Sequence, residues 1–176
     1  PELTLEEIEK LKQLMKQSNF LIYASINEAV ADYYAYEYTG NPAWISPSLP
    51  KEKTRVVSKD RKFECSKKAQ KVWFKGSFNS KLNISEHELG AYFAHFLYQV
   101  AKLRKEKGLG EKTKAQTFKF LAKFAEAFAL NWTTDLISMG DAVRLFIKAE
   151  PTEENVCDLA RNIFPSELGE DRKLCK

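Results

Sequence analysis

The stretch that decides the fold is SEHELGAYFAHFLYQVAKL, residues 85–103. Its large apolar side chains recur at alternating steps of four and three residues: Leu89, Phe93, Phe96, Val100 and Leu103. That spacing lines one face of an α-helix and is typical of helices that pack along a coiled-coil-like seam. Ser85 and Glu88 form a capping box, which satisfies backbone N–H groups of the first turn. We therefore predict a helix that begins here and buries one face.

A longer amphipathic pattern runs from residue 5 to about residue 38, behind a second capping box at Thr4 and Glu7. An unbroken helix over this range is roughly 50 Å long at 1.5 Å per residue. Ser18 and Asn19 offer an alternative, because they can end one helix and cap another. The pattern stops at TGNPAWISPSLP, residues 39–50, whose prolines remove backbone donors and disfavour helix in the preceding residue.

After the central helix, Gly108 and Gly110 provide a C-terminal stop. Asp141 can cap a further short helix, and Pro165 closes the last one. The apolar spacing predicts three more helices in this part of the chain, over residues 112–138, 142–148 and 152–164.

No pair of alternating β-branched runs joined by a turn dipeptide occurs, and no internal repeat is present. The fold class predicted is all-α, a helical bundle of three longer helices plus shorter C-terminal helices. At 176 residues, we expect a single helical domain over residues 1–176, with a Pro-rich loop and a basic segment at 40–80.

The composition is that of an ordinary globular protein, with 44% hydrophobic residues and no run of about 18 apolar residues. The sequence therefore predicts a soluble, cytoplasmic protein with no membrane partner. Its three cysteines, Cys65, Cys157 and Cys175, are widely spaced and form no C-x-x-C pair. We expect them to be reduced thiols.

Residues able to carry out catalysis are scarce. His87 and Glu88 resemble the start of a zinc-protease H-E-x-x-H helix, but Ala91 occupies the second ligand position. His95 is too far along a helix to share an ion with His87. No phosphate-binding glycine loop or nucleophile elbow is present. We predict a non-enzymatic protein without metal or cofactor, and an enzyme that uses His87 or His95 is the minor alternative.

Positive charge is concentrated in one part of the chain. Residues 51–75 contain ten Lys or Arg and three acidic residues, a net charge of +7. The other 18 basic and 21 acidic residues give −3. This asymmetry is expected of a local polyanion site, although a solvated amphipathic helix is the simpler alternative. A helical wheel of residues 65–75 places four lysines on one face and Cys65, Ala69, Val72 and Trp73 on the other.

A second basic cluster lies at KLRKEKGLGEKTK, residues 102–114, and the two clusters could flank one groove along a phosphate backbone. Lysine dominates arginine and no recognition helix is visible, so we expect contacts to phosphates, independent of base sequence. The predicted nucleic-acid-binding residues are Lys59, Arg61, Lys62, Lys67, Lys68, Lys71, Lys75, Arg104, Lys105, Lys107, Lys112 and Lys114.

A small, basic, all-helical chain without catalytic motifs resembles the small subunits of class 1 CRISPR surveillance complexes, some of which are separately translated C-terminal parts of a type I large subunit. The resemblance covers the overall architecture and the basic face. It implies an antiviral-defence protein in a ribonucleoprotein complex, present in more than one copy, that holds target or displaced DNA strands. The implied partners are DNA or RNA, other subunits and further copies of the chain.

Two further interpretations stay open. One is a helical protein-interaction adaptor with an acidic protein partner, anchored by the aromatic loop around Trp44. The other is a DNA-coating protein of a filamentous archaeal virus, which shares the same gross features. The tyrosine row at the end of the first helix is expected to be partly core and partly interface, with base stacking as the alternative: Tyr33, Tyr34, Tyr36 and Tyr38.

Overall fold

The computed structural model describes residues 5–44, 55–63, 86–107, 122, 126, 139–149, 154–171 and 174–175. These residues form five helices and no strand, which confirms the all-α prediction. The helices are α1 (Leu5–Thr39), α3 (Glu86–Glu106), α5 (Met139–Ala149), α6 (Glu154–Ile163) and α7 (Pro165–Leu168). None of them is long and apolar enough to cross a membrane.

Helix α1 is continuous through Ser18 and Asn19, so a single long helix, and not two, is correct. It ends where Gly40 takes a left-handed conformation with a φ of 69°, which a residue without Cβ adopts at little cost. The Gly40 backbone N–H donates to the carbonyl of Tyr36, at 2.7 Å, and satisfies one of the last free carbonyls of the helix.

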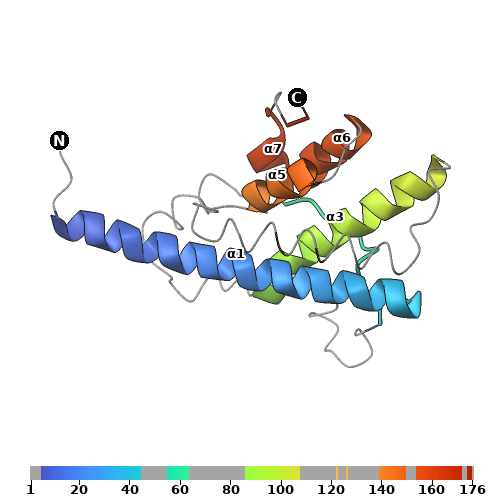
Figure 1. Ribbon diagram of the computed structural model, residues 1–176, viewed down its shortest axis with the longest axis horizontal. Helices are drawn as coiled ribbons and strands as arrows, with labels where there is room; N and C mark the ends of the chain where they lie inside the picture. Colours follow the sequence, from blue (N-terminus) through green and yellow to red (C-terminus); the bar gives the residue numbers. More distant parts are fainter. Residues whose placement is uncertain are drawn as a thin grey trace.

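Helix α3 lies between α1 and the group formed by α5, α6 and α7 (Figure 1). The predicted seam is buried at Leu89, Phe93, Phe96 and Val100, and its last residue, Leu103, is partly buried against the same core. Gly90 lets α3 approach α1 closely, because a Cβ at this position would meet the backbone carbonyl of Ser25 and the backbone N of Ala29.

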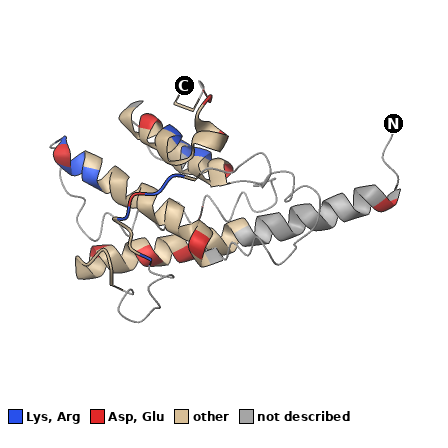
Figure 2. Cartoon of the chain, turned by 180° about the vertical axis from the view of Figure 1, so that it is seen from behind, with Lys and Arg blue, Asp and Glu red and all other residues tan. Residues whose placement is uncertain are grey.

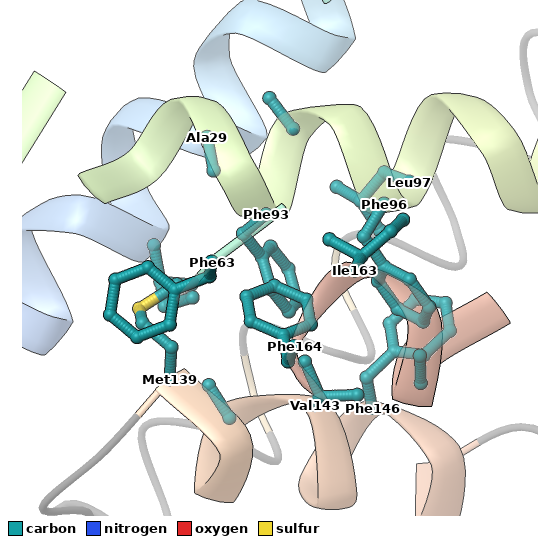
Figure 3. Close-up of a cluster of buried hydrophobic side chains, with 14 of the residues drawn as sticks. Ala29, Phe63, Phe93, Phe96, Leu97, Met139, Val143, Phe146, Ile163 and Phe164 are labelled. Atoms are coloured by element: carbon teal, nitrogen blue, oxygen red, sulfur yellow. The ribbon is translucent and has the colours of Figure 1, made fainter. Parts of the chain in front are cut away.

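Aromatic side chains pack α3 against the C-terminal helices (Figure 3). Phe146 of α5 packs edge-on against Phe96, with 5.2 Å between ring centroids. Phe164, between α6 and α7, contacts Phe96 at 6.2 Å and Phe63 at 6.1 Å. Buried apolar residues from each of the five helices belong to one cluster with these rings, and such packing is the main source of stability.

The C-terminal helices differ from the prediction in two details. Helix α5 begins at Met139, before the predicted cap at Asp141. Pro165 does not simply close the preceding helix, because it is the first residue of α7, where its fixed φ suits a helix start.

The expectation of three reduced thiols is wrong for two of them, because the structure joins Cys157 of α6 to Cys175 in a disulfide, 18 residues apart in sequence. The predicted helix at 112–138 lies outside the described residues, apart from Ala122 and Glu126, both helical and exposed. The basic helix at 66–75 also lies outside the described residues.

Candidate polyanion-binding surface

Residues 55–63, the described part of the basic stretch, form an extended segment with one turn that crosses α3; we call it the basic segment (Figure 2). From the sequence, residues 54–63 could be either extended or helical, and the structure shows no helix over residues 55–63. Two apolar side chains anchor it in the core. Val57 is 2% exposed and Phe63 is 8% exposed, and the Phe63 ring contacts Tyr92 of α3 with 5.2 Å between centroids.

Backbone hydrogen bonds fix both ends of the basic segment. The Val57 N–H donates to the carbonyl of Pro42, at 2.9 Å. At the other end, the Phe63 N–H donates to the carbonyl of Ile163, and the Ser166 hydroxyl donates to the Phe63 carbonyl, at 2.6 and 2.9 Å. The segment is therefore held between the loop after α1 and the junction of α6 with α7.

The side chain of His95 of α3 binds the backbone of the basic segment at Val57. Its Nδ1 lies 2.8 Å from the Val57 carbonyl oxygen, so Nδ1 carries the proton and donates. Its Nε2 lies 3.4 Å from the Gln99 side-chain nitrogen, which suits an acceptor. Burial lowers the pKa of His95, although the bond to Val57 and the charge of Asp60 oppose that shift. A neutral, buried His95 therefore acts as a structural hydrogen-bond donor.

A cluster of charged side chains anchors the start of the segment. Arg55 Nη1 lies 2.6 Å from a Glu28 carboxylate oxygen and 3.5 Å from one of Asp32, both on α1. His87 Nδ1 also lies 2.8 Å from Glu28. Burial raises the pKa of Glu28, but the hydrogen bonds from Arg55 and His87 and their charges outweigh it, so its pKa is lowered. Burial raises the pKa of Asp32 to about 6, against the opposing charge of Arg55.

This pairing changes the charge available to a ligand. A count over residues 51–75 treats Arg55 as part of the positive excess, whereas Glu28 and Asp32 compensate it in the folded chain. The exposed charges of the basic segment are instead Lys59, Asp60 and Lys62. Half-buried Arg61 lies over the Tyr92 ring, 5.8 Å from its centroid.

The second basic cluster lies close to the first along α3. Lys102 follows His95 by seven residues, two helical turns, so it shares the α3 face that the segment crosses and lies about 10 Å further along it. Lys102 is exposed and pairs with Glu106 at 3.7 Å. Figure 2 shows the basic segment and the basic end of α3 from one side. Lys102 was not among the predicted binding residues, because nothing in the sequence marks the side of α3 that the basic segment crosses.

Arg104 and Lys105 point to different sides of α3. Arg104 is half a turn around the helix from the His95 face and lies near Tyr33 of α1. Burial and the hydrogen bond to Glu37 raise the pKa of Tyr33, and the positive charge of Arg104 partly opposes that rise. Lys105 and Lys107 are exposed at the end of the helix. The structure thus leaves Lys59, Lys62 and Lys102 exposed and places Arg104 near Tyr33 of α1.

Six predicted binding residues lie outside the described residues: Lys67, Lys68, Lys71, Lys75, Lys112 and Lys114. Of the tyrosine row, Tyr33 is buried and Tyr36 packs against Tyr98 at 5.1 Å, while Tyr34 and Tyr38 are exposed. Within the described ranges, no group of three His, Cys, Asp or Glu side chains is placed to hold a metal ion. No known family model matches the chain, and no curated protein or solved structure matches it either.

Proposed function

We propose that this chain is a non-enzymatic subunit of a ribonucleoprotein that binds the phosphate backbone of nucleic acid, independent of base sequence. One observation carries the proposal: hydrogen bonds fix the basic segment at both ends, and between them it exposes Lys59 and Lys62. Because the backbone that carries these lysines is already fixed, it loses little conformational entropy when a polyanion binds. Less of the favourable electrostatic free energy is therefore offset by the cost of ordering the chain.

The expected binding is salt-sensitive, because each lysine that neutralises a phosphate releases a condensed counterion. The slope of log affinity against log salt is about −0.9 for each phosphate contact on duplex DNA and about −0.7 on single strands. The basic segment, with the resemblance to CRISPR small subunits, supports DNA strands as the ligand and other subunits as partners.

The test is binding of a labelled oligonucleotide over a range of salt concentrations, with the double variant Lys59→Glu and Lys62→Glu. We expect weaker binding at every salt concentration and a slope smaller by about two contacts. Lys148→Glu is the control, because this lysine is exposed on α5, away from the basic segment in the sequence. Unchanged affinity and slope in the double variant, or an equal effect of Lys148→Glu, would refute the proposal.

A protein adaptor with an acidic partner is the second candidate, and the exposure of Trp44, at 37%, favours it. A pull-down from lysate separates the two candidates. Partners that are lost after nuclease treatment support the nucleic-acid function, and an acidic protein retained after nuclease but lost with Trp44→Ala supports the adaptor.

A further inference from the structure

The second half of α1 directs its charged side chains away from its outer face. Only three charged residues occur in this half. Glu28 and Asp32 contact Arg55 of the basic segment. Glu37 accepts a hydrogen bond of 2.7 Å from the hydroxyl of Tyr33, which is buried in the core. The outer face is therefore built without charge.

The exposed residues of that face form one line, which we call the outer stripe: Asn27, Ala31, Tyr34 and Tyr38. Tyr34 is 45% exposed and Tyr38 is 65% exposed. The steps of four, three and four residues keep the stripe on one side of the helix. In a chain with 30% charged residues, an exposed helix face that is neutral and aromatic is a candidate interface.

The partner that binds the outer stripe is expected to differ in charge from the polyanion that binds the basic segment. At 100° per residue, the outer stripe is turned by about 90–130° around α1 from the two carboxylates that meet Arg55. It therefore faces away from the side of α1 that carries the basic segment. A neutral face also offers no attraction for phosphate, so its partner must present a neutral surface of its own.

We propose that a second copy of this chain docks on the outer stripe, with the two α1 helices antiparallel about a two-fold axis. The stripe is self-complementary in size, because its first two residues are small and its last two are large. Around an axis between positions 32 and 33, Tyr38 lies against Asn27 of the partner subunit, and Tyr34 lies against Ala31 of the partner subunit. Each large ring then fills the space left by a small side chain.

The same axis satisfies the general rule for paired identical chains, in which one patch contacts itself and every contact occurs twice. The average step of 3.5 residues matches the seam of paired helices. A parallel pair would instead oppose Tyr38 to Tyr38 and Ala31 to Ala31, which crowds one end and leaves a gap at the other. The stripe is short compared with the roughly 800 Å² per partner of a standard interface, so the pair dissociates on dilution. This inference does not depend on nucleic-acid binding.

The first test is the mass of the full chain in solution, measured by sedimentation over a hundredfold range of concentration without nucleic acid. We expect the mass to rise from that of one chain toward that of two. The variant Tyr34→Glu with Tyr38→Glu stays a monomer at every concentration. The control, Asn155→Glu with Asn162→Glu, adds the same charge at exposed positions of α6 and associates like the native chain. A native chain that is monomeric throughout refutes the proposal.

The second test fixes the orientation by disulfide crosslinking, in a Cys65→Ser background. In the antiparallel pair, Asn27 of one copy lies about 16 Å along the axis from Asn27 of the partner subunit, but directly opposite Tyr38. A mixture of Asn27→Cys and Tyr38→Cys proteins therefore forms a crosslinked dimer on mild oxidation, and neither protein does so alone. Crosslinking of each protein by itself indicates a parallel pair, and no crosslink in the mixture indicates another occupant; either result overturns the proposal.

Discussion

Replacing Gly90 with alanine is expected to destabilise the protein, although the same change inside an exposed helix usually stabilises it. Alanine is about 1 kcal/mol more favourable than glycine in a helix interior. At position 90, however, the new Cβ lies well inside 3.0 Å of the Ser25 carbonyl oxygen, and 3.3 Å from both the Ala29 nitrogen and the Glu28 Cβ.

The obstacle is backbone, so it cannot rotate away as a side chain would. The two helices must move apart at their closest point, and the seam on either side of it loses contact. Overpacking of a filled core costs about 1–3 kcal/mol and occasionally more. Because the clash is with backbone, we expect a cost near or above the top of that range. After the gain in helix propensity, the net loss is about 2 kcal/mol, or a fall of about 4–8 °C in Tm for a chain of this length.

The assay is urea denaturation followed by far-UV circular dichroism, for the native chain and Gly90→Ala. The matched control is the pair Glu88→Ala and Glu88→Gly, at an exposed position one half-turn earlier in α3. There, alanine should be the more stable of the two by about 1 kcal/mol. If Gly90→Ala is as stable as the native chain, or more stable, the close approach of α1 and α3 at this point is wrong.

Three other perturbations test separate parts of the structure. Phe63→Ala should cost about 3–5 kcal/mol in urea denaturation, because a buried ring between two other rings is lost; Phe63→Leu should cost less. Asp32 has a folded-state pKa of about 6, above its ordinary 3.8, so the folded chain takes up a proton there before the unfolded chain does. Relative to Asp32→Asn, the native chain should therefore gain about 2 kcal/mol of stability as pH falls from about 6 to 4, and parallel stability curves would contradict this. Reduction of the bond between Cys157 and Cys175 should lower the free energy of unfolding by about 3 kcal/mol, since it closes a loop of 18 residues, and a Tm that ignores reductant would contradict the pairing.

The helices were predictable because their signals are local. The spacing of Leu89, Phe93 and Phe96 repeats within two turns, and capping residues adjoin the helix that they start. Helix α7 was missed because it is four residues long, too short for a period to appear. The Cys157–Cys175 pair was missed because the turn that returns the chain to α6 has no distinctive spacing.

The candidate site was predictable only in outline. The concentration of positive charge at residues 51–75 is visible in the sequence, but the neutralisation of Arg55 by Glu28 and Asp32 is not. Arg55 meets Glu28 across 27 residues, and His87 meets the same carboxylate across 59. Such contacts depend on how α1 and α3 pack, and no spacing rule along the chain encodes them. For the same reason, the sequence did not distinguish the side of α3 that carries Lys102 from the side that carries Arg104.

The anchoring of Phe63 by residues far along the chain has a consequence for biosynthesis. Its partner Ser166 lies 103 residues later in the sequence. At about 5–20 residues per second, the ribosome delivers that partner roughly 5–20 seconds after Phe63. During this interval the lysines of the basic segment have already been synthesised, whereas the junction of α6 and α7 that holds Phe63 has not. During synthesis, the basic charge of this segment is therefore present before the contacts that fix its C-terminal end can form.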